Sequence, residues 1–320
     1  MTYLAKPAAL VAAVALSMVA GVASAQTVGI GSNPQGSAAY GTAAAIAALV
    51  SRNSDYNMRV IPQGGPDVTI PLVNTGELEF SVSNSIPVYY AQRGGAMFRD
   101  RPQENVRMVA ALYNLNVAFF VRADSDIQSM EDLRGRRVAT EFTGQRVLHT
   151  MQSAILATVG MSVADLEAVP VPSGVRGVDE FDAGSVDATI FSVGSGRVQQ
   201  SNASVGGLRW LPVPLTDEAQ AALVAVAPGS YIEEIQPNES RVGITGPTGV
   251  FAGPFLLIAG ENTPEDMVYA VTRLIHENAE ALGAADAQFL DFDPANMARD
   301  LDIQMHPGAI RFYREIGLLP

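Results

Sequence analysis

Residues 27–50 read TVGIGSNPQGSAAYGTAAAIAALV, and the order of residue types in this stretch decides the fold. The apolar residues 27–31 predict a short strand, and the Gly, Ser, Asn and Pro residues after them predict a turn. The Ala-rich residues 37–50 then predict a buried helix. Strand, polar turn and helix in this order form the first half of a βαβ unit.

The same alternation continues along the chain, so we expect an α/β protein with two α/β units in sequence, followed by a strand and a long helix. Such alternation indicates parallel sheets, whose ligands bind at the carboxyl ends of the strands. Two lobes joined by strands, with a ligand between them, are the simplest architecture for this pattern. The predicted strands are residues 27–31, 58–61, 78–82, 106–112, 117–121, 137–140, 166–171, 187–191 and 255–259. The predicted helices are residues 37–50, 67–74, 86–92, 145–159, 178–183, 264–282 and 307–316.

The first 25 residues have the features of a signal peptide. Lys6 provides the positive start, residues 8–22 form an apolar run of 15 residues, and residues 23–25, Ala-Ser-Ala, match the small-x-small pattern that signal peptidase cleaves. The run is shorter than the roughly 20 apolar residues that span a bilayer, although a retained membrane anchor is the alternative. We therefore predict an exported, periplasmic protein that begins at Gln26 after cleavage.

The composition excludes several classes of function. Without Lys6 the chain has 19 basic residues against 33 acidic ones, a net charge of −14, which argues against a nucleic-acid partner. It has no cysteine, which excludes disulfides, thiolate metal sites and cysteine nucleophiles. There is no Gly-x-Ser-x-Gly nucleophile motif, and the histidines lie too far apart for a helical metal pair. We expect no metal and no cofactor. The three histidines are His149, His276 and His306.

Polar residues follow the predicted strands of the first unit. The spacing of Gly31 and Gly36 resembles a P-loop, but Ser37 stands where a nucleotide site requires lysine, so nucleotide binding is not expected. A helix start with free backbone N–H groups and a serine hydroxyl suits an anion such as a carboxylate. The alternative is an ordinary turn in which Ser37 only caps the helix. The candidate ligand-binding residues of this unit are Asn33, Gln35, Gly36, Ser37, Tyr40, Gln63, Gly64, Ser83, Asn84 and Ser85.

The second unit repeats this chemistry at two strand ends. Thr143 and the backbone amides near Gly144 are expected to hold an anion. Arg146 either adds a bidentate contact or lies on the solvated face of its helix. Glu141 would repel a dicarboxylate unless it meets an ammonium group or points away. The candidates of this unit are Glu141, Thr143, Gly144, Gln145, Arg146, Ser192, Val193 and Gly194.

Five segments of the chain together resemble the TAXI family (TRAP-associated extracytoplasmic immunogenic proteins), the solute receptors of TRAP transporters. The last segment, combined with the Gly/Ser-Tyr opening of the first, is fairly specific. The segments are IGSNPQGSAAYGTAAAIAALV (30–50), GELEFSVSNS (76–85), SMEDLRGRRVATEFTGQ (129–145), GSVDATIF (184–191) and MHPGAIRFYREIG (305–317).

The resemblance implies a type II periplasmic binding-protein fold, with two α/β lobes, two crossover strands and a ligand cleft between the lobes. It also implies no catalytic activity, a small organic anion such as glutamate or 2-oxoglutarate as ligand, and the TRAP membrane permease as partner. We further expect the protein to be a monomer. On this fold we expect residues 26–115 and 258–320 to form lobe I and residues 116–257 to form lobe II. The two crossings are expected near residues 114–116 and 255–259.

The contacts of the family carry over where segments match. These positions are Gly36, Ser37, Tyr40, Ser83, Asn84, Ser85, Thr143, Gly144, Ser192, Val193 and Gly194. The family's second-lobe turn is commonly richer in Gly and Ser than residues 141–146 are, and the segment after Phe191 lacks the aromatic or proline residues often found there. These departures leave the ligand open. Two other classes also stay open: a secreted enzyme on the same scaffold, with Glu141 as its acid/base candidate, and a receptor that serves a signalling sensor.

Overall fold

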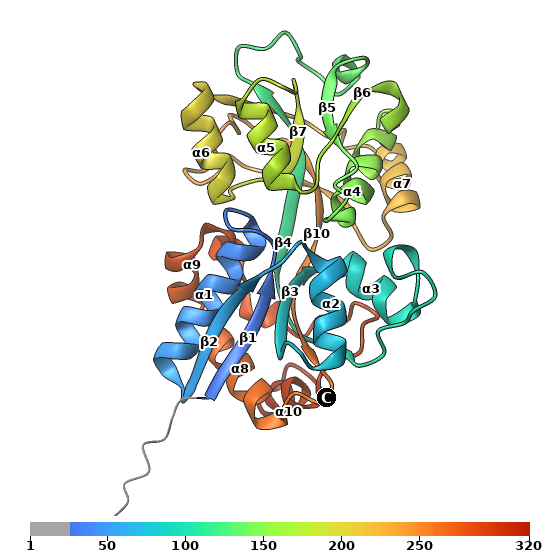
Figure 1. Ribbon diagram of the computed structural model, residues 1–320. Coiled ribbons are helices and arrows are strands. Elements are labelled where there is room, and N and C mark those ends of the chain that lie inside the picture. The colour runs from blue at the N-terminus through green and yellow to red at the C-terminus, as the bar shows by residue number, and fades with distance from the viewer. Residues whose placement is uncertain (1–25) are drawn as a thin grey trace, which may run out of the picture.

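A computed structural model describes residues 26–320, so the predicted signal peptide, residues 1–25, lies outside the described residues. Two α/β lobes are stacked end to end and joined by two long strands, β4 (Val106–Arg122) and β10 (Thr248–Gly260) (Figure 1). The predicted α/β class with two lobes and two crossover strands is confirmed. None of the described helices is long and apolar enough to cross a membrane.

Lobe I takes its elements from both ends of the described chain. These are β1 (Gln26–Ser32), α1 (Ala38–Asn53), β2 (Tyr56–Pro62), α2 (Pro66–Thr75), β3 (Phe80–Asn84), α3 (Ser85–Arg93), η1 (Ala96–Phe98), α8 (Glu265–Glu277), α9 (Ala279–Ala285), η4 (Ala287–Asp291), η5 (Pro294–Asn296) and α10 (Pro307–Glu315). The sheet order is β2-β1-β3-β10-β4, with β1 parallel to β2 and β3 and with β10 antiparallel to β3 and β4. Helices α1, α8 and α9 pack together on one side of the sheet, and α2 and α3 pack on the other (Figure 1).

Lobe II is formed by the middle of the chain. Its elements are η2 (Glu131–Leu133), β5 (Arg137–Thr140), α4 (Arg146–Ala157), η3 (Val163–Asp165), β6 (Glu167–Pro170), α5 (Gly174–Asp182), β7 (Thr189–Ser192), α6 (Gly196–Val205), β8 (Leu208–Leu211), α7 (Asp217–Val226) and β9 (Tyr231–Ile235). Strands β5 and β6 are parallel, while β7 and β8 pair with β4 and β9 pairs with β10, all antiparallel. The loops after β5 and β7 therefore face lobe I.

The two crossover strands pair with each other where the lobes meet. β4 is one continuous strand rather than the two strands predicted at 106–112 and 117–121, because the polar residues Asn114 and Asn116 stay in the ladder. Leu115 lies opposite Gly253. The return crossing is therefore at residues 252–254, slightly before the predicted position, since Phe255–Ala259 already pairs with β3 of lobe I. The exact lobe boundaries stay a prediction.

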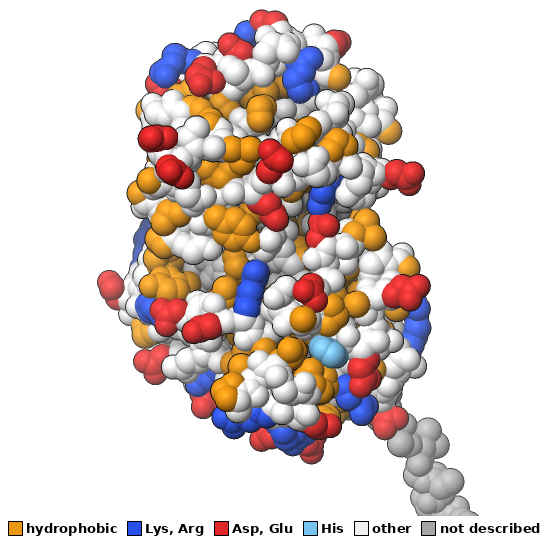
Figure 2. Space-filling view, turned by 180° about the vertical axis from the view of Figure 1, so that it is seen from behind, with side chains coloured by type: hydrophobic (Ala, Val, Ile, Leu, Met, Phe, Trp, Pro, Cys, Tyr) orange, Lys and Arg blue, Asp and Glu red, His pale blue; other side chains and the backbone are white. Residues whose placement is uncertain are grey.

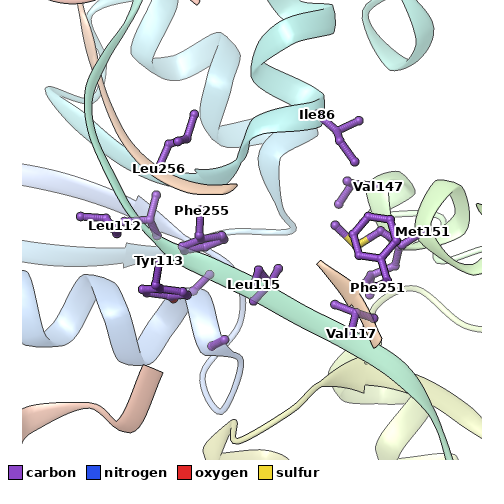
Figure 3. Close-up of a cluster of buried hydrophobic side chains, with 14 of the residues drawn as sticks. Ile86, Leu112, Tyr113, Leu115, Val117, Val147, Met151, Phe251, Phe255 and Leu256 are labelled. Atoms are coloured by element: carbon purple, nitrogen blue, oxygen red, sulfur yellow. The ribbon is translucent and has the colours of Figure 1, made fainter. Parts of the chain in front are cut away.

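The apolar core extends from one lobe into the other. Ile86 on α3 of lobe I belongs to the same buried cluster as Val147 and Met151 on α4 of lobe II (Figure 3). Phe251 on β10 is fully buried in this cluster as well. Burying an aliphatic side chain of this size stabilises by about 1.5–3 kcal/mol, so apolar contacts help to hold the lobes together. On the outside, acidic and basic side chains are scattered over both lobes (Figure 2).

Some predicted elements differ from those observed. The helix predicted at 264–282 breaks into α8 and α9 at Asn278, whose backbone leaves the helical region and whose Nδ2 donates to Leu274 O at 2.8 Å. Asparagine competes in this way with the helical backbone for hydrogen bonds. The elements α6, β8, α7 and β9 were not predicted, and all four lie in the part of lobe II that follows β7.

Candidate ligand-binding cleft

The loop after β1 ends against lobe II. Ser37 caps α1, because its Oγ accepts a hydrogen bond from Tyr40 N at 3.2 Å and donates one to Pro34 O at 2.7 Å. Gly36 has φ +89°, a conformation that favours glycine, and its carbonyl accepts a hydrogen bond from Arg197 N on α6, 3.1 Å away. The hydroxyl of Ser37 is thus used inside its own loop, and the backbone of Gly36 joins the two lobes.

The turn after β2 meets the turn after β5. A Cβ atom on Gly64 would lie only 3.0 Å from Gly144 O, so two glycine backbones make this contact between the lobes. Gln145 is buried, and its Oε1 accepts a hydrogen bond from Gly174 N at the start of α5, at 3.1 Å. Candidates from two lobes therefore lie side by side here, and the amide of Gln145 is partly engaged in holding lobe II together.

Strand β3 ends in the buried polar residues Ser83 and Asn84, and α3 begins with the buried Ser85. Asn84 caps α3 through its Oδ1, which accepts a hydrogen bond from Ile86 N at 3.0 Å. Its Nδ2 is buried and has no hydrogen-bond partner among the described residues. The Oγ of Ser83 donates to Asn84 O at 3.0 Å. The end of β3 therefore offers an unused amide donor beside the crossing strand β10.

The end of β7 is held from both lobes. Val193 N donates to Asn116 O on β4, and Val193 O accepts a hydrogen bond from Nε2 of Gln288 on η4, both at 2.9 Å. Gly194, the next residue, is buried. The Oγ of Ser195 is buried and has no hydrogen-bond partner in the described part of the chain.

Four buried polar atoms without a partner among residues 26–320 lie at strand ends or at the crossing. They are Asn84 Nδ2, Asn116 Oδ1, Thr140 Oγ1 and Ser195 Oγ. Leaving such a group unsatisfied costs about 1–3 kcal/mol, and a polar ligand that bonds to it removes that cost. The set combines donors and acceptors without any formal charge, which suits a small polar or anionic molecule held by neutral groups.

The predicted candidates differ in exposure. The buried ones are Ser37, Ser83, Asn84, Ser85, Gln145, Ser192, Val193 and Gly194. The partly exposed ones are Asn33, Gly36, Tyr40, Gln63, Gly64, Gly144 and Arg146, and the exposed ones are Gln35, Glu141 and Thr143. Their contact with a ligand stays a prediction.

Arg146 reaches from lobe II to lobe I. Its Nε lies 2.6 Å from Asp67 Oδ2, and its Nη2 donates to Met97 O at 3.1 Å. The side chain of Asp67 is only 7% exposed, and its Oδ1 has no partner among the described residues. The guanidinium therefore ties the lobes together, which neither of the two sequence-based expectations for Arg146 included.

The turn after β5 contains two non-glycine residues in the left-handed region, Glu141 with φ 65° and Phe142 with φ 46°. Phe142 is fully buried and lies near Gly177 on α5, whereas Glu141 is exposed. Backbones in this region cost on the order of 1–3 kcal/mol and cluster at binding sites. The turn thus packs Phe142 into lobe II and leaves Glu141 facing solvent.

A polar pocket between the lobes contains residues that sequence analysis missed. Val193 and Gly194 line it together with Asn114 and Asn116 of β4, the 238–241 loop of lobe II and η4 of lobe I. Two asparagines inside an otherwise apolar strand were the only local signal. The pocket's other polar side chains are Asn238, Ser240, Arg241, Gln288 and Asp291.

Glu233 on β9 lies behind this pocket. Its two carboxylate oxygens are each 3.4 Å from Nδ2 of Asn114. Burial raises the pKa of Glu233, and the negative charge of Asp291 adds to this, whereas the hydrogen bond from Asn114 and the guanidinium of Arg241 lower it. Strand β9 thus carries a half-buried carboxyl group whose pKa depends in part on Asn114 of β4 and on Asp291 of lobe I.

A second partly buried carboxyl group, that of Asp286, lies beside α1. Thr42 Oγ1 is 2.5 Å from the hydroxyl of Tyr113 and donates to Asp286 Oδ2 at 3.2 Å. Burial raises the pKa of Asp286, and burial together with the charge of Asp286 raises the pKa of Tyr113. Asp286 also accepts a hydrogen bond from Gln288 N, so it supports the residue that reaches Val193.

Comparison with known proteins is consistent with this geometry. The model of the NMT1-like family matches residues 30–317. The alkanesulfonate-binding protein SsuA from Xanthomonas axonopodis pv. citri, solved bound to MOPS, is 15% identical, with a TM-score of 0.52 over 92% of this chain and 94% of that one. A structure described as a periplasmic transporter is 16% identical, with a TM-score of 0.57 over 91% and 93% of the two chains. The periplasmic sulfonate-binding protein SsuA from Methylobacillus flagellatus KT is 14% identical, with a TM-score of 0.50 over 92% and 96%. At these identities the likeness shows the fold.

Proposed function

The chain belongs to the NMT1-like family, and on that premise we propose that it is an exported solute receptor that captures a small organic acid between its lobes and delivers it to a membrane transporter. The ligand is a dicarboxylate or an amino acid, with 2-oxoglutarate and glutamate as the first candidates. The receptor is a monomer.

The observation that carries this proposal is the set of buried polar atoms without partners at Asn84, Asn116, Thr140 and Ser195. Three of them lie at or just after strand ends, where open α/β sheets bind their ligands, and Asn116 lies on the crossing strand β4. Asn84 Nδ2 and the hydroxyls of Thr140 and Ser195 can donate hydrogen bonds to a carboxylate, and such bonds are strong in a closed, water-poor cleft. Asn116 Oδ1 can only accept a hydrogen bond, for example from the ammonium group of an amino acid. Two of the similar structures are sulfonate-binding proteins by description, which supports an anionic ligand.

Export is the second part of the proposal. It rests on the apolar run at residues 8–22 and the cleavage pattern before Gln26. The descriptions of two similar structures as periplasmic support the same location. N-terminal sequencing of protein isolated from the periplasm is expected to begin at Gln26.

The proposed membrane partner is a TRAP permease, on the basis of the five segments that resemble the TAXI family. One similar structure is described as part of a sulfonate ABC transporter instead, so the two assignments differ in energy source. The test reconstitutes a TRAP permease in vesicles and adds the chain together with the labelled acid. Uptake driven by an ion gradient without ATP is expected, and strict ATP dependence would assign the receptor to an ABC system.

We further propose that the chain is not an enzyme. Glu141, the one acid/base candidate from the sequence, is exposed on a turn, whereas the side chain of its neighbour Thr140 is buried. General acid/base catalysis requires a group within hydrogen-bond reach of the reacting atom. Incubating each bound acid with the protein and recording NMR spectra is expected to show unchanged compound.

Thermal-shift measurements on residues 26–320 test ligand capture. A ligand present at 100 times its Kd adds about 2.7 kcal/mol, which raises the Tm of a chain of this size by roughly 5–10 °C. Asn84→Ala is expected to weaken the response, whereas Leu290→Ala, at an exposed position, serves as the control. If no small carboxylate raises the Tm of the unmodified protein, the organic-acid proposal is wrong.

A further inference from the structure

We propose that an apolar chamber beside the cleft takes the non-polar part of the captured acid, so that the ligand carries an apolar substituent in addition to its acid group. This inference rests on the proposed function. The chamber has a volume of about 270 Å³ and lies between the lobes. For comparison, an engineered apolar cavity of about 150 Å³ binds benzene.

The lining of the chamber is mostly apolar. Ile86 and Tyr89 come from α3, and Leu301 and Ile303 come from the segment before α10. Ile86 and Ile303 are buried in the folded protein. A cavity of this composition gains free energy when it receives an apolar group, because apolar surface leaves water on both sides of the contact.

The charged group at the chamber is already neutralised. Asp302 is the acidic lining residue, and its Oδ2 lies 2.8 Å from Nη2 of Arg93. The guanidinium of Arg93 in turn lies 3.8 Å from the centre of the Tyr89 ring. Asp302 therefore has its own counter-ion, so a ligand does not need a second charged group to neutralise it.

One edge of the chamber is formed by the residue that follows the end of β3. Ser85 lines the chamber and is the first residue of α3, directly after Asn84 with its unpartnered Nδ2. Residues four apart share a helix face, so Ser85 and Tyr89 lie one above the other on α3. A molecule whose acid group is held at the end of β3 can therefore extend its apolar part along α3.

Both lobes contribute to the chamber. Pro228 and Gly229, in the turn between α7 and β9 of lobe II, face α3 of lobe I across it. A group that touches both walls binds the closed arrangement more tightly than an open one and shifts the population toward closure. The apolar substituent thus contributes to closure as well as to affinity.

Calorimetry with a series of straight-chain carboxylates tests this inference, with acetate, butanoate, hexanoate and octanoate as probes and with succinate and 2-oxoglutarate as compact diacids. We expect affinity to rise about fourfold for each added CH₂ until the chamber is full, as burial of a CH₂ group contributes about 0.8 kcal/mol. Ile303→Trp fills the chamber and is expected to abolish this dependence on chain length. Ile316→Trp, at an exposed position, is the matched control and is expected to keep it.

A second variant keeps the inference testable if Ile303→Trp does not fold. Tyr89→Ala enlarges the chamber and is expected to move the optimum to longer chains. If compact acids bind and chain length has no effect, the chamber inference is overturned while the proposed function stands. If no acid binds at all, both are overturned. A third outcome is an affinity that does not depend on the chain length of the acid, together with loss of transport in Ile303→Trp. It would mean that the chamber contacts the transporter, and it would also overturn the inference.

Discussion

The two sides of the cleft are closed by different kinds of contact. On the α2/α4 side, a side-chain ion pair joins Arg146 to Asp67, with Nε and Oδ2 2.6 Å apart. On the α1/α6 side, the backbone N–H of Arg197 donates to the carbonyl of Gly36 at 3.1 Å. The first contact depends on charge and the second on backbone shape, so the two sides respond to different perturbations.

Arginine has opposite roles on the two sides. The guanidinium of Arg146 crosses to the other lobe, whereas that of Arg197 stays in lobe II, where it pairs with Asp179 and Asp182 at 2.9 and 2.6 Å. Arg197 therefore fixes the position of its own N–H, and this N–H makes the contact between the lobes. A contact of the first kind is screened by salt, and a contact of the second kind is not.

The largest effect is expected from Arg197→Ala. This change leaves the carboxylates of Asp179 and Asp182 without their shared partner in a partly buried position. We expect a loss of about 2–3 kcal/mol in the free energy of unfolding, somewhat less than for a fully buried pair. Urea unfolding measures it. Arg176→Ala, which removes a more exposed pair with Asp179, is the control and is expected to cost less than about 1 kcal/mol. Equal losses in the two variants would show that Arg197 has no special role.

The next effect is expected from Gly36→Ala. Gly36 has φ +89°, and its Cβ would lie 3.3 Å from Cβ of Arg197, so alanine strains both the backbone and the contact. We expect a cost of roughly 1–2 kcal/mol and a larger radius of gyration by small-angle scattering at any salt concentration. Gly196→Ala, where a Cβ has open space, is the control. An unchanged radius would mean that the backbone contact does not hold this side closed.

Acidity provides a third test, at the carboxyl group beside α1. Because burial raises the pKa of Asp286 above the value of the unfolded chain, its contribution to stability is present below about pH 4 and is lost as the pH rises through the folded-state pKa. Asp286→Asn removes the ionisable group, so the variant does not lose stability in this way as the pH rises. We therefore expect the variant to have the higher Tm at pH 7, with a difference that shrinks toward pH 4. A Tm difference that is constant with pH would contradict this assignment.

The smallest effect on stability is expected from Asp67→Asn. Removing a partly exposed ion pair changes the free energy of unfolding by less than about 1 kcal/mol, since Arg146 is 41% exposed. The effect on the arrangement of the lobes is expected to be larger than the effect on stability. In the unmodified protein, salt enlarges the radius of gyration by screening the pair, and in the variant this salt dependence disappears. If the radius of gyration of Asp67→Asn still depends on salt, the salt dependence arises from a contact other than this ion pair.

Lobe I and the first part of lobe II were predictable because their signals are local. Strand β5 and the N-cap at Ser37 follow from residues within one or two turns of each other. The second part of lobe II was not predictable in this way. Helix α6 reads GRVQQSNASV, with few apolar residues, and β9 reads YIEEI and is only partly buried. Both acquire their structure from the neighbours they pack against.

The sequence by itself determined the succession of strands and helices as far as β7, the polar strand ends and the two-lobe class, because each of these depends on residues close together in the chain. Only the tertiary structure decided which polar groups meet. Arg146 and Asp67 are 79 positions apart, and Gln288 and Val193 are 95 apart. Which of the amides at the crossing remain without partners likewise depends on how the lobes close. Contacts of this kind are set by the packing of whole lobes, for which no short stretch of sequence carries a signal.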